Sequence, residues 1–134
     1  MEEKKQKILI VDDDQLLLNI YTQKFAKGGF EVAASAKGEE ALEKLRGGFE
    51  PDILLLDLVM PSLDGFDLLE KMKEEKLIKK ASVIMLTNQG QKSDIGRAKK
   101  LGVSGYIMKA NTTPSEVLSR IGEMRKGDFK DDKK

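Results

Sequence analysis

The chain has 134 residues, 24 of them basic and 23 acidic, and its net charge is +1; it contains neither cysteine nor histidine. A balanced charge gives no support for binding to nucleic acid or to a membrane surface, which usually shows as a basic excess. The missing residue types exclude disulfides, thiolate chemistry and histidine metal ligands. No apolar run is long enough to span a bilayer and no signal-peptide core begins the chain, so we expect a single-domain cytoplasmic protein.

Five short apolar runs of strand length alternate with amphipathic helix patterns. We expect strands at 7–11, 30–34, 82–86 and 105–108, and a further strand from Ile53 that ends at Asp57. The helices are expected from apolar residues at helical spacing, which are Leu17, Ile20, Tyr21 and Phe25, then Ala41, Leu42 and Leu45, then Phe66, Leu69 and Met72, then Ile95, Ala98 and Leu101, and finally Val117, Ile121 and Met124. This alternation predicts an α/β fold with a doubly wound parallel sheet of five strands and five helices.

Local signals support three helix starts and mark the ends of the domain. Asp14 and Asp64 are expected N-caps, and the sequence from Thr113 to Glu116 is a capping box with proline at the first helical position. Residues 1–6 are polar and expected to be disordered, residues 7–125 form the predicted domain, and residues 126–134 form a charged tail that is expected to be flexible.

Polar side chains of distinct chemistry follow four of the five predicted strands. Asp12 and Asp13 follow the first strand, Asp57 the third, Thr87 the fourth and Lys109 the fifth. The carboxyl ends of parallel strands lie at one edge of a sheet, where ligands bind in open α/β folds. We therefore expect these five residues to converge, although they are far apart in the sequence.

The chemistry of this group points to phosphoryl transfer. Three carboxylates in one place repel one another, and an all-oxygen ligand set favours a hard divalent ion such as Mg²⁺. Lys109 supplies a compact positive charge for a phosphoryl oxygen, and a carboxylate such as Asp57 can act as a nucleophile towards phosphorus. Each residue alone has an ordinary structural explanation, such as a helix N-terminus that favours negative charge for Asp12 and Asp13 or a solvated surface position for Lys109, so the inference depends on their clustering.

The motifs ILIVDDD, LLLDLVMPSLDG, MLTN and GYIMK together resemble the response-regulator receiver domain, over about residues 7–124. The resemblance implies a CheY-like, flavodoxin-like sheet with strand order 2-1-3-4-5. It also implies that Asp57 is the phosphoacceptor, and that Asp12 and Asp13 bind Mg²⁺ together with Asp57 and the backbone carbonyl of Val59. Thr87 and Lys109 match the switch hydroxyl and the phosphate-pairing lysine, and Tyr106 matches the switch aromatic residue.

The family implies partners as well as a site. The phosphoryl donor would be a sensor histidine kinase or a phosphotransfer protein, and the imidazole must come from that partner because this chain has no histidine. The signal would leave through the face formed by the fourth helix, the fifth strand and the fifth helix. Its expected exposed members are Arg97, Lys100, Ser104 and Ser119. The protein is expected to be a monomer or a phosphorylation-dependent dimer, a signalling switch rather than an enzyme in the usual sense.

Three residues near the predicted site bear on how it would work. Ala110 stands where the family usually has a proline joined by a cis bond, so we expect the Lys109–Ala110 bond to be trans. Asn88 stands where a smaller residue is usual and is expected to narrow access to Asp57. Val59 cannot orient an attacking water, so we expect the phosphorylated form to lose its phosphoryl group slowly.

Other function classes remain as alternatives. A degenerate receiver that acts only as a docking surface ranks second. A phosphohydrolase of the haloacid-dehalogenase type needs an aspartate two residues after the nucleophile, where this chain has Val59. A nucleotide or flavin module is disfavoured because neither G-x-G-x-x-G nor G-x-x-x-x-G-K-[ST] occurs in the sequence.

Overall fold

The computed structural model describes residues 5–124 and 129–131 of the chain. The N-terminal segment expected to be disordered therefore lies mostly outside the described residues, and Lys5 and Gln6 are exposed just before the first strand. Much of the predicted flexible tail, residues 126–128 and 132–134, also lies outside them. Within the part of the chain that is described, no helix is both long enough and apolar enough to cross a membrane.

A parallel sheet forms the centre of the molecule, and its first five strands have the predicted order β2-β1-β3-β4-β5. The strands are β1 (Lys7–Val11), β2 (Glu31–Ser35), β3 (Ile53–Leu56), β4 (Ser82–Thr87) and β5 (Gly105–Met108). They alternate with α1 (Gln15–Lys27), α2 (Gly38–Arg46), α3 (Gly65–Glu74), α4 (Lys92–Lys100) and α5 (Pro114–Ile121), and a 3-10 turn, η1 (Lys109–Asn111), follows β5. The predicted fold class is confirmed, with β2 at one edge of the sheet.

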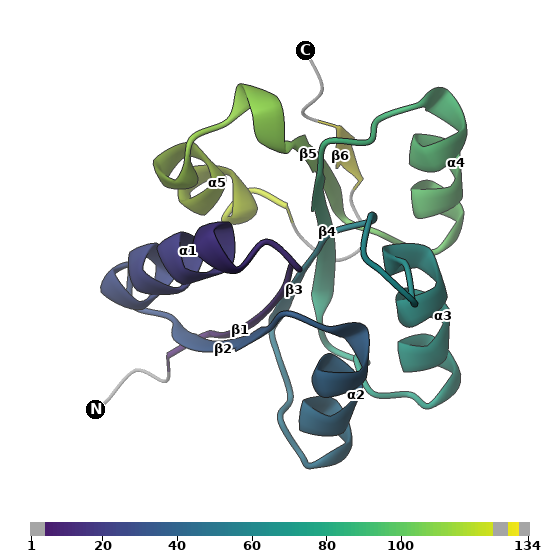
Figure 1. Cartoon of the computed structure of the whole chain (residues 1–134), viewed down its shortest axis with the longest axis horizontal. Coiled ribbons are helices and arrows are strands. Elements are labelled where there is room, and N and C mark those ends of the chain that lie inside the picture. Colours follow the sequence, from purple (N-terminus) through teal and green to yellow (C-terminus); the bar gives the residue numbers. More distant parts are fainter. Residues whose placement is uncertain (1–4, 125–128, 132–134) are drawn as a thin grey trace.

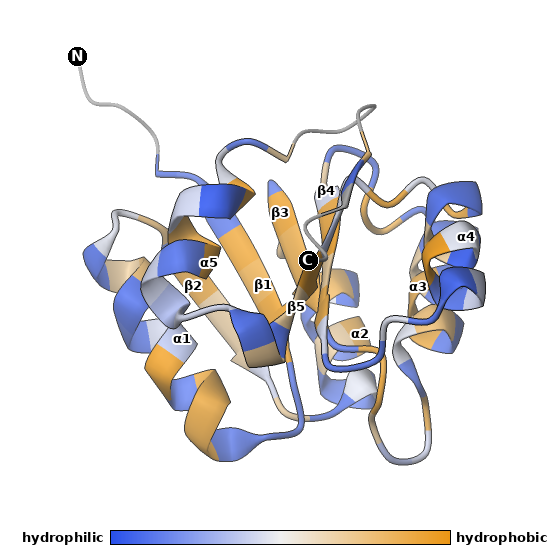
Figure 2. Cartoon of the chain, turned by 90° about the horizontal axis from the view of Figure 1, so that it is seen from above, coloured by the Kyte–Doolittle hydropathy of each residue, from blue (hydrophilic) through white to orange (hydrophobic). Residues whose placement is uncertain are grey.

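Two layers of helices cover the two faces of this sheet. Helices α1 and α5 lie on one side, and α2, α3 and α4 lie on the other (Figure 1). Alternate residues of each inner strand enter the two separate cores; Leu9 and Leu54 face α2 and α3, whereas Ile8 and Leu55 face α1 and α5. The central strands are therefore apolar along their length, as Figure 2 shows, because both faces of each strand are buried.

A sixth strand, β6 (Lys130–Asp131), extends the sheet beyond β5 and was not predicted from the sequence. It runs parallel to β5, with Lys130 opposite Gly105, and the Lys130 N–H donates to the Ser104 carbonyl at 3.0 Å. Its hydrogen bonds come from the backbone, so a charged sequence can form it without the apolar pattern that identifies a buried strand.

The predicted helix starts are confirmed, whereas one predicted buried face is partly wrong. The side chains of Asp14, Asp64 and Thr113 accept hydrogen bonds from backbone N–H groups in the first turns of α1, α3 and α5. In α1 the buried residues are Leu18, Tyr21 and Phe25, while the predicted Ile20 is 40 % exposed. A shift of one residue is possible because α1 has leucine at three successive positions, and spacing alone does not select among them.

Candidate functional site

The ends of β1 and β3 bring two of the predicted carboxylates together. Val11 and Leu56 lie opposite each other in the sheet, and the Asp57 N–H donates to the Val11 carbonyl at 3.0 Å. Asp12 and Asp57 therefore follow neighbouring strands at the same level. Both side chains are buried, with 2 % and 6 % of the residue exposed, whereas Asp13 is exposed.

Lys109 reaches both buried carboxylates. Its Nζ lies 2.6 Å from Asp12 Oδ2 and 2.9 Å from Asp57 Oδ2, and only 9 % of its side chain is exposed. The turn that carries it is closed by the Thr112 hydroxyl, which donates to the Met108 carbonyl at 2.6 Å. The Lys109–Ala110 bond is trans, as predicted, since the described residues contain no cis peptide bond.

Burial affects the pKa values of Asp12 and Lys109, which form the shorter of the two ion pairs. Loss of water raises the pKa of the Asp12 carboxyl, and the hydrogen bonds from Lys109 and from the Asp14 N–H reduce that shift without reversing it. Burial opposes the charge of Lys109 as well, but the hydrogen bonds to Asp12 and Asp57 outweigh it and raise the pKa of the ammonium. Lys109 is therefore positively charged at neutral pH, a fixed cation inside an acidic site.

The three aspartates also have the arrangement that a cation site needs. One oxygen from each of Asp12, Asp13 and Asp57 lies within 4.8 Å of the other two. Carboxylate oxygens suit Mg²⁺, which usually takes one or two carboxylates and keeps several waters. The residues thus fit the predicted metal. Val59 contributes its N–H to Asp57 Oδ1 at 3.3 Å, and the assignment of its carbonyl as a metal ligand still rests on the family resemblance alone.

A cavity of about 510 Å³ opens above Asp57. It is lined by Asp57, Val59, Thr87, Asn88, Gln89, Gly90, Gln91 and Lys109. Thr87 is the last residue of β4 and is fully buried, and its Oγ1 accepts a hydrogen bond from the Gln89 N–H at 3.2 Å. All five predicted strand-end residues therefore come together at this edge; Asp12, Asp57 and Thr87 are buried, and Asp57, Thr87 and Lys109 line the cavity.

Tyr106 is fully buried, and its hydroxyl donates to the Gln89 carbonyl. The backbone of Gln89 thus accepts a hydrogen bond from the Tyr106 hydroxyl and donates one to the Thr87 hydroxyl oxygen. Residue type could not have identified Gln89, because these contacts use only its backbone atoms, which any residue would supply.

Gly65 is a second residue whose role beside the site was missed. Its N–H donates to the Leu58 carbonyl at 2.9 Å, and a Cβ at this position would lie 2.3 Å from the Asp57 carbonyl oxygen. The start of α3 can approach the loop after β3 this closely only because residue 65 is a glycine. The sequence Asp64-Gly65 predicted the cap but not this packing.

Comparisons with known proteins agree with this geometry. The family model described as the response regulator receiver domain matches residues 8–121. The chemotaxis protein CheY1 of Helicobacter pylori is 35 % identical over 107 residues, which cover 79 % of this chain and 86 % of that protein. The crystal structure of a CheY-like receiver domain protein from Methanospirillum hungatei has a TM-score of 0.80 and 32 % identity, and the match covers 90 % of this chain and 93 % of that one.

Longer regulators match the chain as well. A probable transcriptional regulator, ycf27, of Pyropia yezoensis is 34 % identical over 121 residues, which cover 90 % of this chain and 48 % of that protein. The chain thus spans about half the length of such relatives. The match to the family model begins in β1, at residue 8, and includes β2 to β5 and all five residues of the candidate site, so the chain belongs to the response-regulator receiver family and has the CheY-like fold.

Proposed function

We propose that this receiver takes a phosphoryl group onto Asp57 in a Mg²⁺-dependent reaction and thereby switches a protein-interaction surface. The observation that carries the proposal is the pairing of the buried Asp57 carboxylate with the Lys109 ammonium at 2.9 Å, beside an open cavity and two further aspartates. Receivers act in general as signalling switches of two-component systems, and these residues supply the groups that such a switch needs.

The chemistry is a displacement at phosphorus. An Asp57 oxygen forms the new bond to phosphorus while the bond from phosphorus to the donor breaks, and the donor leaves with that electron pair. The family resemblance implies that the donor would be a phosphohistidine of a sensor histidine kinase or of a phosphotransfer protein, and the imidazole would come from that partner because this chain has no histidine. Mg²⁺ held by Asp12, Asp13 and Asp57 would neutralise charge on the phosphoryl oxygens. Lys109 is already positioned to pair with one of those oxygens.

Two hydrogen bonds support a route from the site to the surface. Thr87 and Tyr106 both contact the backbone of Gln89, one through its N–H and the other through its carbonyl. If the Thr87 hydroxyl turns to donate to a phosphoryl oxygen, the acceptor of the Gln89 N–H moves with it. The loop after β4 then changes, and so do the start of α4 and the partner of the Tyr106 hydroxyl.

The output surface is proposed to be the face of α4, β5 and α5. Arg97, Lys100 and Ser119 are exposed, as predicted, although Arg97 is turned towards α3, where it forms an ion pair with Glu70 at 2.9 Å. The prediction that Ser104 is exposed was wrong. Ser104 is 1 % exposed because its N–H donates to the Val83 carbonyl and its own carbonyl accepts from Lys130 of β6. Ser104 lies directly before β5, where Lys130 of β6 hydrogen-bonds to it. The target itself would be a further domain or a separate protein, and the protein is proposed to act in the cytoplasm.

A docking module that is never phosphorylated remains the second candidate. It is favoured by one observation, the shorter bond of Lys109 to Asp12 than to Asp57, which holds the ammonium in place without any phosphoryl group. In such a module the acidic site would serve only to fix the loops of this edge.

Intact-protein mass spectrometry after incubation with acetyl phosphate tests the proposal. We expect a gain of one phosphoryl group that requires Mg²⁺ and that is absent from Asp57→Asn. The matched control is Asp52→Asn, which removes a half-buried carboxylate at the opposite end of β3. If the wild type gains no mass, the proposal is refuted and the docking module is favoured. A gain in mass of Asp57→Asn would show that another residue accepts the phosphoryl group.

A further inference from the structure

The short strand β6 covers the outer edge of β5, on the side of α4 (Figure 1). Its two residues lie opposite Gly105 and Tyr106, and the Lys130 N–H donates to the Ser104 carbonyl at 3.0 Å. Without β6, β5 would be the edge strand of the sheet, and its backbone N–H and C=O groups could pair with another extended segment. The chain therefore places a strand of its own on part of the proposed output face.

Phe129, directly before β6, anchors this strand. Its half-buried ring packs against the core on the side of α3 and α4, and the Lys99 ammonium of α4 lies 5.0 Å from the centre of the ring. A cation over an aromatic face attracts it weakly at an exposed site. Residues 129–131, which we call the C-terminal strap, thus connect the edge of β5 with α4.

The docked position of the C-terminal strap has an unfavourable contribution. The Ser104 side chain is buried, and its hydroxyl has no hydrogen-bond partner among the described residues. A hydroxyl that gives up water without gaining a partner disfavours the docked state about tenfold. Release of the strap would return water to this hydroxyl, so the docking is suited to be reversible.

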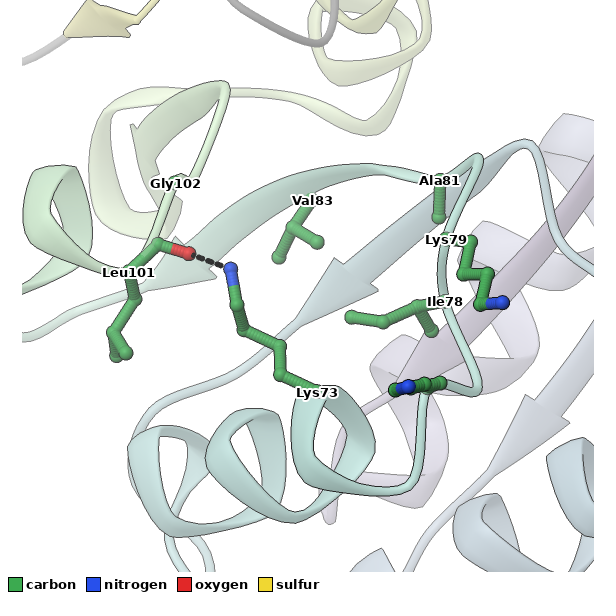
Figure 3. A pocket seen from close by; sticks show the side chains of 8 residues that line it. Lys73, Ile78, Lys79, Ala81, Val83, Leu101 and Gly102 are labelled. Atoms are coloured by element: carbon green, nitrogen blue, oxygen red, sulfur yellow. Dashed lines mark hydrogen bonds between the residues drawn. The ribbon is translucent and has the colours of Figure 1, made fainter.

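The opposite side of α4 has contacts without this disadvantage. Lys73 of α3 donates to the Leu101 carbonyl at 2.5 Å, as Figure 3 shows. Arg97 forms an ion pair with Glu70 at 2.9 Å, and its guanidinium lies 4.5 Å from the centre of the Phe66 ring. Of the two sides of α4, we therefore expect the contact with the strap to break first.

Tyr106 connects the C-terminal strap to the proposed switch. Its hydroxyl donates to the Gln89 carbonyl in the loop after β4, and its backbone lies opposite Asp131 of β6. Its ring belongs to the core cluster against which Phe129 packs. A change in the hydrogen bond to Gln89 that moves the Tyr106 ring would therefore disturb both the anchor and the pairing of the strap.

We propose that the C-terminal strap covers the edge of β5 in the unphosphorylated protein and leaves it when Asp57 is phosphorylated, so that an extended segment of the target protein pairs with β5 in its place. The inference rests on the proposed function, because phosphorylation supplies the signal. The strap itself shows which segment fits this edge. It is an extended backbone preceded by an aromatic residue that reaches the core beside Lys99.

A tryptophan at position 129 reports on the strap, because the chain contains no other tryptophan. Acrylamide quenching of the full-length Phe129→Trp protein is compared with that of the same protein carrying Lys130→Pro or Lys130→Ala. Proline removes the N–H that donates to Ser104, whereas alanine retains it, so we expect the quenching constant to about double in the proline variant alone. Ser104→Ala should lower the constant, because it removes the unpaired hydroxyl. Equal quenching in the proline and alanine variants would overturn the proposal, and thermal melts verify that all variants are folded.

Acetyl phosphate with Mg²⁺ supplies the signal, and intact mass shows how much of the protein carries a phosphoryl group. Phosphorylation of Phe129→Trp should raise its quenching constant to the level of the Lys130→Pro variant, and Asp57→Asn/Phe129→Trp should show no change. A gain in mass without a change in quenching would overturn the release of the strap and leave the proposed function intact. Absence of a gain in mass would overturn both, whereas the comparison at Lys130 would still show whether the strap is docked.

Discussion

Replacing Gly65 by alanine should destabilise the protein, although alanine is the better helix former. The new Cβ would lie 2.3 Å from the Asp57 carbonyl oxygen and 2.9 Å from the Leu58 Cα, and both are backbone atoms that cannot rotate away. A relaxed contact between carbon and oxygen is about 3.3 Å, so α3 and the loop after β3 must separate by about 1 Å. Overpacking of this kind costs roughly 1–3 kcal/mol. We expect a loss of about 2 kcal/mol in the free energy of unfolding and a fall in Tm of about 8 °C.

Gly96 supplies the matched control for this prediction. It lies inside α4, and a Cβ there would meet no atom within 4 Å. Gly96→Ala should therefore raise the free energy of unfolding by about 0.5–1 kcal/mol, the usual gain for alanine in a helix. Urea unfolding of the two variants beside the wild type makes the comparison. If Gly65→Ala is as stable as the wild type, the close approach of α3 to Asp57 does not exist in solution and the reasoning fails.

Three further predictions concern the acidic site and one helix cap. Mg²⁺ should raise the Tm of the wild type, because a ligand that binds only the folded state stabilises it, and a Mg²⁺ titration of Asp13→Asn should show a much smaller rise. Val59→Asn should shorten the lifetime of the phosphorylated form, measured by intact mass over time; a lifetime equal to or longer than that of the wild type would contradict this. A hydrogen bond from the Thr113 N–H lowers the pKa of Glu116 below its usual 4.5. The stabilising effect of the Glu116 carboxylate is therefore present above about pH 4.5 and is lost as the pH falls through the lowered pKa. Glu116→Gln should remove this part of the acid dependence of Tm, measured in thermal melts between about pH 2 and 6.

The convergence of the site was predictable because it depends on topology. Once five strands are recognised as parallel, the residues after them must lie at one edge, and Asp12, Asp57, Thr87 and Lys109 do so. No knowledge of side-chain packing is needed for that step. The helix caps at Asp14 and Asp64 were predictable for a similar reason, since a cap depends on a few neighbouring residues.

The features that the sequence did not reveal depend on contacts between distant backbone segments. The pairing of β6 with β5 and the contacts of Gln89 leave no mark in residue type, because backbone groups make them. The expected exposure of Ser104 rests on the family resemblance alone, which does not include β6, and its burial follows from the pairing of β6 with the residues before β5. The pairing of Lys109 with Asp12 as well as Asp57 required distances, since strand order shows which residues are near but not which oxygen an ammonium selects.

The ion pairs of Lys109 affect the charge of the acidic site when no phosphoryl group is bound. Three aspartates meet at this edge, and the ammonium neutralises part of their charge from within the chain. Lys109 therefore acts as a counterion for the aspartates, and the protein can fold without a bound divalent ion. Under the proposed function, a Mg²⁺ ion that binds the aspartates would compete with Lys109 for the Asp12 oxygen, and the released ammonium would pair with a phosphoryl oxygen at Asp57. One side chain would thus couple the binding of the metal to the arrival of the phosphoryl group.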